Sequence, residues 1–272
     1  MDVHGVPTIA LPSGAAVPVL GQGTWRMAER GADGAAELEA LRHGLDLGLT
    51  LIDTAEVYAG GASEQLVGEA IAGRRDEVFL VTKVSPSHAT RDGVIAACEG
   101  SLRRLRTDRI DLYLLHWPAR APLEETVDGF RTLVDSGKVV HWGVSNFDIP
   151  LLDELLQVPG GSDVAANQVL YNLRRRGIER DLVPRCSARG IPIMAYTPLG
   201  ERGLLGDPTL GRVARRHGAT PAQVALAWIL RLDLMLAIPK AASREHVEEN
   251  RGALDVELTD EDLSELDAAF PV

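Results

Sequence analysis

Cysteine is nearly absent from this chain of 272 residues, which contains only Cys98 and Cys186. Each lies in an apolar, helix-like stretch, without CxxC spacing and without a nearby His or Cys partner. Such thiols cannot form the disulfide framework of a small secreted domain, and they are typical of buried free thiols in a reducing cytosol. The histidines likewise lack metal-ligand spacing, so we expect no bound metal. Those to which we assign no function are His4, His43, His88, His141 and His217.

Long apolar runs are also missing. No stretch approaches the roughly 18–20 apolar residues of a membrane-spanning helix, and residues 1–12 lack the basic and apolar segments of a signal peptide. Basic residues are outnumbered, with 28 Lys and Arg against 39 Asp and Glu and a net charge of −11. This balance argues against binding to nucleic acid or to anionic membranes. We therefore expect a cytoplasmic protein.

No linker, low-complexity segment or shift in composition divides the chain, so we expect residues 1–272 to form a single domain. Its length suits one α/β barrel, which typically takes about 250 residues. A short apolar strand, a turn and an amphipathic helix follow one another repeatedly. After an amino-terminal hairpin, eight strands are expected at residues 19–23, 49–53, 78–83, 110–115, 139–144, 164–168, 191–195 and 234–238. Most are continuous apolar runs, as in parallel strands that are buried on both faces.

Helices are expected between these strands, where apolar residues recur with helical spacing. Asp33 and Ser63 are the expected N-caps of the first two helices, and Thr220-Pro221-Ala222-Gln223 marks a later helix start. Others are expected at residues 90–105, 123–136, 149–157 and 178–188, in two segments before residue 234, and at 243–250 and 259–269. Residues 8–10 and 17–19 flank a Pro12-Ser13-Gly14 turn and predict the hairpin.

Eight strands alternating with helices predict a closed (β/α)8 TIM barrel of the α/β class, with a doubly wound open sheet as the competing fold. The first strand is followed by Gly21-Gln22-Gly23-Thr24-Trp25, which lacks GxGxxG spacing, and no helix follows at once. The barrel is therefore preferred. The amino-terminal hairpin is expected to plug its bottom, and the two short C-terminal helices are expected to close the fold.

Polar and aromatic residues stand at the end of every expected strand. They are Thr24-Trp25, Asp53, Lys83, His116-Trp117, Ser145-Asn146, Asn167-Gln168, Tyr196 and Pro239-Lys240. In barrels of this kind the active site lies at the C-terminal ends of the strands. Any one of these residues is ordinarily a solvated loop residue, whereas all eight strand ends together predict a binding site on one rim.

Four residues on this rim suit carbonyl reduction, which needs an acid to protonate the growing alkoxide. Free Tyr has a pKa near 10, and an ammonium beside Tyr58 is expected to lower that pKa. Asp53 would hold the Lys83 ammonium in place and charged. His116 would donate a hydrogen bond to the carbonyl oxygen. Taken singly, a buried ion pair, a loop tyrosine and a core histidine are ordinary structural features, so the interpretation rests on their joint placement.

Stretches along nearly the whole chain resemble the aldo-keto reductase superfamily, most closely its short bacterial methylglyoxal and 2,5-diketogluconate reductases. They are GQGTW (21–25), LTLIDTAEVYAGGASEQLVGEAI (49–71), VFLVTKV (78–84), SLRRLRTDRIDLYLLHWP (101–118), GKVVHWGVSNF (137–147), NQVLYN (167–172), MAYTPLG (194–200) and IPKAASREHVEEN (238–250). The IDTAEVY and LLHWP segments are specific in this context. The resemblance implies a catalytic tetrad of Asp53, Tyr58, Lys83 and His116, with Tyr58 as the general acid.

The resemblance also implies that NADPH binds extended across the barrel mouth, without a Rossmann fold. Tyr196 would stack on the nicotinamide, and Lys240 would meet the adenosine 2′-phosphate. Ser145, Asn146 and Gln168 would bind the carboxamide. The full cofactor-binding set that it implies is Gly23, Thr24, Asp53, Ser145, Asn146, Gln168, Tyr196, Thr197, Leu199, Gly200, Lys240, Ser243, Arg244, His246, Glu249 and Asn250.

The chain departs from the family near the expected phosphate site. Ala241 stands where many members have Ser, and His246 stands where an Arg often grips the phosphate. Arg244 would compensate, so NADPH is expected and NADH use stays open. The segment 199–210 and the C-terminal tail are short compared with longer members, which predicts an open pocket and broad substrate selection.

Trp25, Trp117 and Phe147 lie just past strand ends and are expected to wall the pocket for a small-molecule carbonyl substrate. The arginines at 174–176 could draw anionic substrates, although a solvated loop is their commoner role. A monomer is expected. The alternative function is a non-catalytic cofactor-binding sensor or regulatory subunit of the same fold, which would be expected to carry an extra interaction segment that this chain lacks.

Overall fold

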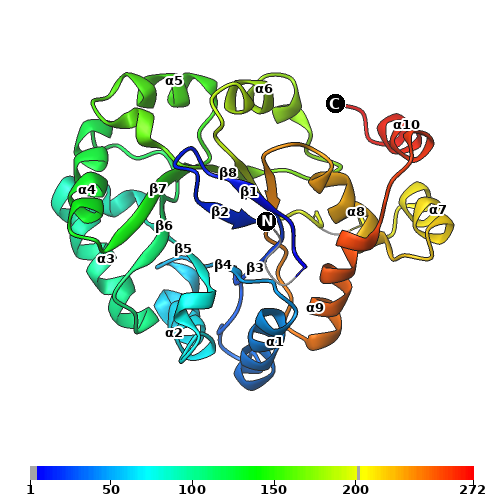
Figure 1. The fold of residues 1–272 in the computed structure, drawn as a ribbon, viewed down its shortest axis with the longest axis horizontal. Helices are drawn as coiled ribbons and strands as arrows, with labels where there is room; N and C mark the ends of the chain where they lie inside the picture. Colours follow the sequence, from blue (N-terminus) through cyan, green and yellow to red (C-terminus); the bar gives the residue numbers. More distant parts are fainter. Residues whose placement is uncertain (1–4, 201–202) are drawn as a thin grey trace.

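Eight parallel strands form a ring at the centre of the protein, and helices surround it (Figure 1). The computed structural model describes residues 5–200 and 203–272. Within the sheet, neighbouring strands follow the chain order from β3 to β10. The strands are β3 Gly21–Gly23, β4 Leu51–Asp53, β5 Phe79–Val84, β6 Ile110–Leu115, β7 Val139–Ser145, β8 Asn167–Leu170, β9 Ile193–Tyr196 and β10 Met235–Ala237.

Backbone contacts between the first and last strands close the ring. Gly23 forms a parallel bridge to Lys240, and the Ala237 amide donates to the Val19 carbonyl over 2.8 Å. Gly23 permits this approach because a Cβ there would meet the Ile238 carbonyl oxygen at 2.6 Å. Closure removes the free strand edges that an open sheet would expose. The closed barrel is therefore confirmed over the doubly wound sheet.

Helices cover the outer face of the strands. The α-helices are α1 Gly34–Asp46, α2 Ala62–Ala70, α3 Arg91–Leu105, α4 Leu123–Asp135, α5 Ile149–Gln157, α6 Leu182–Ser187, α7 Pro208–Arg216, α8 Pro221–Leu230, α9 Arg244–Arg251 and α10 Asp260–Ala269. The 3-10 helices are η1 Tyr58–Gly61, η2 Arg75–Glu77, η3 Pro86–His88, η4 Gly161–Asp163, η5 Gly177–Glu179 and η6 Gly252–Asp255. No helix within the described ranges is long and apolar enough to cross a membrane.

Two predicted helix starts are confirmed and one is wrong. Asp33 caps α1, and Thr220 forms a complete capping box with Gln223 at the start of α8. At α2 the residue before the helix is Gly61 in a left-handed conformation, and Ser63 lies inside the first turn. The buried Ser63 hydroxyl instead donates to Thr24 Oγ1 over 2.8 Å. Ser63 therefore ties the end of β3 to α2, which its position near a helix start did not indicate.

Two elements differ most from their predicted extent. The strand expected from residue 164 is assigned from Asn167, where pairing with the next strand begins through the Pro192 carbonyl. Ala165 already pairs with β7, because its amide donates to the Trp142 carbonyl over 2.8 Å. The helix expected at residues 178–188 is broken into η5 and α6, and Asp181 caps the second piece.

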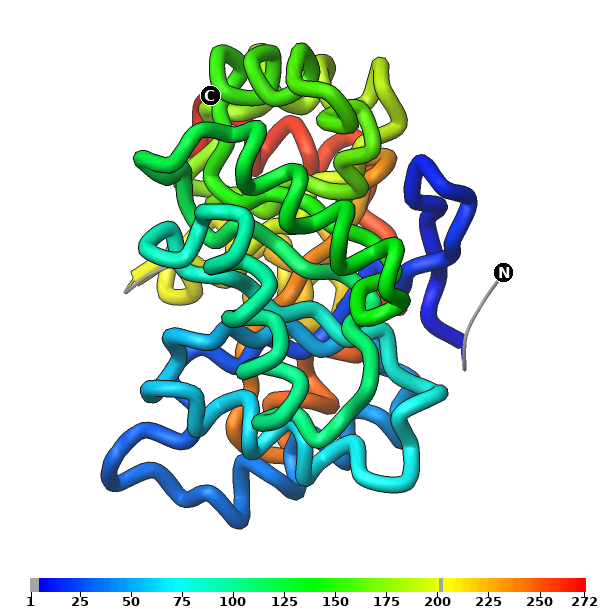
Figure 2. Tube along the Cα trace, turned by 90° about the vertical axis from the view of Figure 1, so that its left-hand side faces the viewer, coloured from blue at the N-terminus to red at the C-terminus, as the bar shows by residue number. Residues whose placement is uncertain are grey.

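A hairpin of β1 Thr8–Ala10 and β2 Ala16–Pro18 closes the N-terminal end of the barrel. Its buried residues Leu11 and Val17 pack against apolar side chains from the barrel strands and their ends: Leu51, Val81, Leu112, Leu114, Met194, Leu236 and Ile238. Figure 2 shows the hairpin, in dark blue, on the opposite side of the molecule from the chain around residue 200, in yellow. The predicted plug is confirmed, and the other end of the barrel is left for a site.

The chain ends on the loop that follows β8. Arg176 donates to the Phe270 carbonyl over 2.6 Å, and Arg180 donates to the Val272 carbonyl over 2.6 Å. Arg176 is buried and also pairs with Glu179 at 2.8 Å. These bonds hold the segment after α10 against the β8–α6 loop.

Candidate active site

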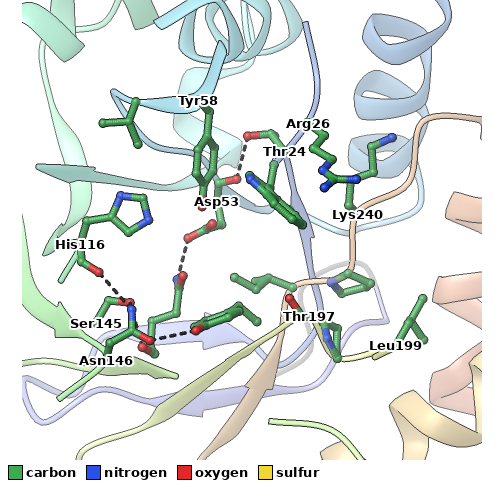
Figure 3. Close-up of a pocket in the computed structure, with 18 of the residues that line it drawn as sticks. Thr24, Arg26, Asp53, Tyr58, His116, Ser145, Asn146, Thr197, Leu199 and Lys240 are labelled. Carbon is green, nitrogen blue, oxygen red and sulfur yellow. Dashed lines mark hydrogen bonds between the residues drawn. The ribbon is translucent and has the colours of Figure 1, made fainter. Parts of the chain in front are cut away.

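A cavity of 690 Å³ lies at the C-terminal ends of the strands (Figure 3). Side chains from every strand end except that of β5 line it. The lining residues are Gly23, Thr24, Trp25, Arg26, Glu29, Asp53, Val57, Tyr58, Ala59, His116, Trp117, Ser145, Asn146, Gln168, Tyr196, Thr197, Pro198, Leu199, Gly200, Ile238, Pro239 and Lys240. Several lining residues are not among the site residues predicted from the sequence: Arg26, Glu29, Val57, Ala59, Pro198 and Ile238.

A buried ion pair between Asp53 and Lys83 lies at the base of this cavity. Asp53 pairs with Val81 in the parallel register of β4 and β5, which puts Lys83 two residues further along and on the same face as Val81. Lys83 Nζ lies 2.6 Å from Asp53 Oδ2 and 2.9 Å from the Thr54 carbonyl oxygen. Burial lowers the pKa of Lys83, but the Asp53 carboxylate and Tyr58 outweigh it and leave that pKa raised. The ammonium is therefore charged at neutral pH.

Tyr58 lies against this ammonium, with its hydroxyl 3.3 Å from Lys83 Nζ. Burial raises the pKa of Tyr58 above 10, and the charge of Lys83 opposes that rise only in part. The predicted lowering by Lys83 is therefore present, but burial outweighs it and the pKa of Tyr58 stays above its ordinary value. Burial destabilises the charged tyrosinate more than the nearby Lys83 ammonium stabilises it. Tyr58 is consequently a neutral proton donor at pH 7.

The ring of His116 packs against the ring of Tyr58. The two rings are 5.6 Å apart between centroids and meet edge to face at 75°. Burial, and then the charge of Lys83, lower the pKa of His116 from 6.5 to about 3. The imidazole is therefore neutral at physiological pH and can donate one ring N–H to an uncharged acceptor. Asn146 holds the backbone of His116, because Asn146 Nδ2 donates to the His116 carbonyl over 3.1 Å.

The loop that carries Tyr58 holds a strained backbone. Ala59 has φ +47°, a left-handed conformation that costs a residue other than glycine about 1–3 kcal/mol. Glu56 anchors the loop, since its Oε1 accepts the Ser85 amide over 2.6 Å and lies 2.9 Å from His88 Nδ1. Sequence reasoning missed Glu56, because nothing in the pattern distinguishes it from other surface carboxylates.

Polar side chains of β7, β8 and β9 form a second cluster across the mouth. Ser145 donates to the Gln168 carbonyl over 2.9 Å, and Tyr196 donates to Asn146 Oδ1 over 2.9 Å. Gln168 Nε2 donates to Asp53 Oδ1 over 2.7 Å. The cluster is thus bonded directly to the buried ion pair. Amide and hydroxyl groups of this kind suit a carboxamide, and the half-buried Tyr196 ring offers a flat surface beside them.

The far end of the cavity is cationic. Lys240 lines it, is exposed, and its ammonium has no hydrogen-bond or ion-pair partner among the residues that the structure describes. Thr197, Leu199 and Gly200 line the wall on the way to it. A polar cluster, a flat ring and a free cation in one cavity match the carboxamide, the nicotinamide and the phosphates of a dinucleotide, so the residues present fit NADP(H).

The remaining predicted cofactor contacts lie on or next to α9, outside this cavity lining. They are Ser243, Arg244, His246, Glu249 and Asn250. Ser243 caps α9 by accepting the His246 amide, and Asn250 is buried. Arg244 and His246 are exposed at the start of the helix. Their role in phosphate binding stays a prediction.

Two of the three predicted substrate residues line the cavity. Trp25 and Trp117 do so and are 53% and 51% exposed. Phe147 does not: it is buried in the hydrophobic core around the barrel and absent from the lining. The prediction for Phe147 is wrong because its side chain turns away from the mouth. The arginines at 174–176 also lie outside the lining.

The open pocket predicted from the short segment 199–210 stays a prediction, because residues 201 and 202 lie outside the described residues. His4, to which no function was assigned, also lies outside them.

Comparison with known proteins agrees with this geometry. The model of the aldo/keto reductase family matches residues 19–270. Methylglyoxal reductase YeaE of Escherichia coli (strain K12) is 49% identical over 260 residues, which cover 94% of this chain and 92% of that protein. An aldo/keto reductase from Klebsiella pneumoniae, solved with NADP and acetate, has a TM-score of 0.95 at 47% identity and covers 100% of this chain and 96% of its own. A K. pneumoniae aldo-keto reductase in complex with NADPH has a TM-score of 0.95 at 48% identity, covering 98% of this chain and 95% of its own.

The low pKa of His116 predicts an acid-dependent loss of stability. The unfolded chain takes up a proton at this residue below about pH 6.5, whereas the folded protein does so only near pH 3. The stabilisation is thus complete above pH 6.5 and is lost as the pH falls towards 3. Between about pH 7 and pH 5 the unsubstituted protein should therefore lose free energy of unfolding that His116→Asn does not lose. We expect a difference of about 2 kcal/mol in urea titrations. Equal losses would contradict the buried neutral imidazole.

Proposed function

Since this chain belongs to the aldo/keto reductase family, we propose that Tyr58, Lys83, Asp53 and His116 carry out its carbonyl reduction, with Tyr58 as the proton donor. The protein is an NADP(H)-dependent oxidoreductase that reduces carbonyl compounds to alcohols. The observation that carries the proposal is the contact of the Tyr58 hydroxyl with Lys83 Nζ at 3.3 Å. Lys83 belongs to a buried ion pair with Asp53, and the neutral His116 lies beside the phenol.

The four residues divide the work on the carbonyl. Bound NADPH supplies the hydride. His116, being neutral, donates a hydrogen bond to the carbonyl oxygen and orients it. Tyr58 keeps its proton until charge develops on that oxygen and then transfers it. Lys83 is already charged and lies beside the tyrosinate that remains, and Asp53 holds the ammonium there.

Other side chains would hold the cofactor. Ser145, Asn146 and Gln168 would bind the carboxamide, Tyr196 would stack on the ring, and Lys240 would meet the 2′-phosphate. One face of the carbonyl would thereby be turned towards the reactive ring, and the ion pair beside Tyr58 is buried away from water.

We propose small aldehydes, ketoaldehydes and diketones as substrates. The name of the methylglyoxal reductase from E. coli supports the ketoaldehyde, and the exposed indoles of Trp25 and Trp117 support flat or apolar carbonyl compounds. We also propose that the protein acts as a single-domain monomer in the cytoplasm. The net charge of −11 and two buried free thiols support a cytoplasmic protein that binds no nucleic acid.

Tyr58→Phe removes the acid and keeps the ring. We expect turnover of methylglyoxal and of pyridine-3-carboxaldehyde to fall at least about a hundredfold, the scale of general-acid catalysis. The dissociation constant for NADPH, measured by quenching of protein fluorescence, should stay within about threefold, because the binding groups are untouched. Near-normal turnover in this variant would remove Tyr58 from its role.

Lys240→Ala tests the cationic end of the cavity. We expect the dissociation constant for NADPH to rise at least about tenfold and that for NADH to change little, because only NADPH carries the 2′-phosphate that an ammonium would neutralise. Val57→Ala, a change in the lining that removes no charge, is the control and should leave the ratio of the two constants unchanged. Equal weakening of both cofactors by Lys240→Ala would show that Lys240 does not read the phosphate.

A further inference from the structure

The Gln168 amide crosses the barrel mouth to reach the buried ion pair. Its Nε2 lies 2.7 Å from Asp53 Oδ1, although the two residues are 115 positions apart in the chain. In the closed ring, three strands separate β8 from β4 on either side, so the bond joins opposite walls. Gln168 is 2% exposed and Asp53 is also 2% exposed. The bond is therefore shielded from water, where its loss leaves a buried acceptor unpaired.

The two Asp53 oxygens have separate partners. Oδ2 accepts from Lys83 Nζ over 2.6 Å, and Oδ1 accepts from Gln168. A carboxylate with both oxygens held cannot rotate about its terminal torsion. The direction of Lys83 towards the Tyr58 hydroxyl at 3.3 Å thus depends on Gln168 as well as on Asp53.

Chemistry fixes which way the Gln168 amide faces. An ionised carboxylate only accepts hydrogen bonds, so the amide nitrogen must face Asp53. The amide oxygen then points elsewhere, and no donor among the described residues is bonded to it. Because Gln168 lines the cavity, this oxygen is free to accept a hydrogen bond from a bound molecule.

We propose that Gln168 is a positioning residue for catalysis, which links the bound nicotinamide to the proton-donating group through Asp53. Its oxygen accepts an N–H of the cofactor carboxamide while its nitrogen holds Asp53 against Lys83. This inference rests on the proposed function and deepens it. Gln168 contributes to turnover as well as to cofactor affinity, which separates it from residues that contact the cofactor alone.

Ser145 provides the matched control. Its hydroxyl belongs to the same polar cluster and is a proposed carboxamide contact, but it bonds to the Gln168 backbone carbonyl and has no bond to Asp53. Removal of that hydroxyl should weaken cofactor binding and leave the ion pair in place.

The first test compares Gln168→Met with Ser145→Ala at saturating NADPH. We expect kcat for methylglyoxal to fall at least about tenfold in Gln168→Met, because misplaced catalytic groups cost rate even with cofactor bound. In Ser145→Ala the dissociation constant for NADPH should rise, and the fall in kcat should be clearly smaller than in Gln168→Met, because the bond from Gln168 to Asp53 is kept. A Gln168→Met protein with raised dissociation constant and unchanged kcat would overturn the inference.

The second test uses the cofactor-free protein and needs no turnover. Gln168→Glu keeps the shape of the side chain but sets a second carboxylate against Asp53. We expect its Tm at pH 8 to lie below that of Gln168→Met by several degrees, because two acceptors then face each other in a buried site. A Gln168→Glu protein as stable as Gln168→Met would contradict the assigned amide direction. Full activity of Tyr58→Phe would refute the proposed function and leave this stability result unaffected, so the two failures are distinguishable.

Discussion

The buried pairing of Asp53 with Lys83 is the constraint on which the site depends. Lys83 is fully buried, and an ammonium in that position is tolerated only with a partner, since removal of one member of a buried pair costs about 3–5 kcal/mol. The parallel register of β4 and β5 brings the two groups together, and the closed barrel excludes water from them. The proposed proton transfer from Tyr58 therefore depends on the Lys83 ammonium, the same charge that Asp53 neutralises in the folded protein.

Exclusion of water also sets the protonation states of the neighbouring groups. Burial raises the pKa of Tyr58 and lowers that of His116, so both are uncharged at neutral pH beside a charged lysine. The proposed proton donor and the proposed hydrogen-bond donor to the carbonyl therefore line the cavity without a net charge of their own. Two cations of the lining, Lys240 and Arg26, lie away from this end (Figure 3), and neither has an ion-pair partner among the residues that the structure describes. These unpaired cations and the neutral Tyr58 and His116 are thus separated along the cavity.

The sequence predicted the barrel and the tetrad because both follow from strand order. Parallel strands bring their C-terminal residues to one rim, so Asp53, Lys83 and His116 could be grouped without coordinates. The sequence did not reveal where a side chain after a strand turns, and Phe147 packs into the core instead of lining the pocket. It also did not show that burial outweighs the Lys83 charge in setting the pKa of Tyr58. Nor did it show the hydrogen bond from Gln168 to Asp53. Both features depend on the width of the closed barrel and on the exclusion of water, which a local sequence pattern does not indicate.

The most direct test of the central claim is the turnover of Lys83→Met with saturating NADPH. If the ammonium stabilises the tyrosinate that forms at Tyr58, a variant that still folds and binds NADPH should lose at least about a hundredfold in kcat, in line with the loss of an activated proton donor. A variant that binds NADPH and retains turnover within about threefold would show that the proton comes from elsewhere, and the account of this site would be wrong.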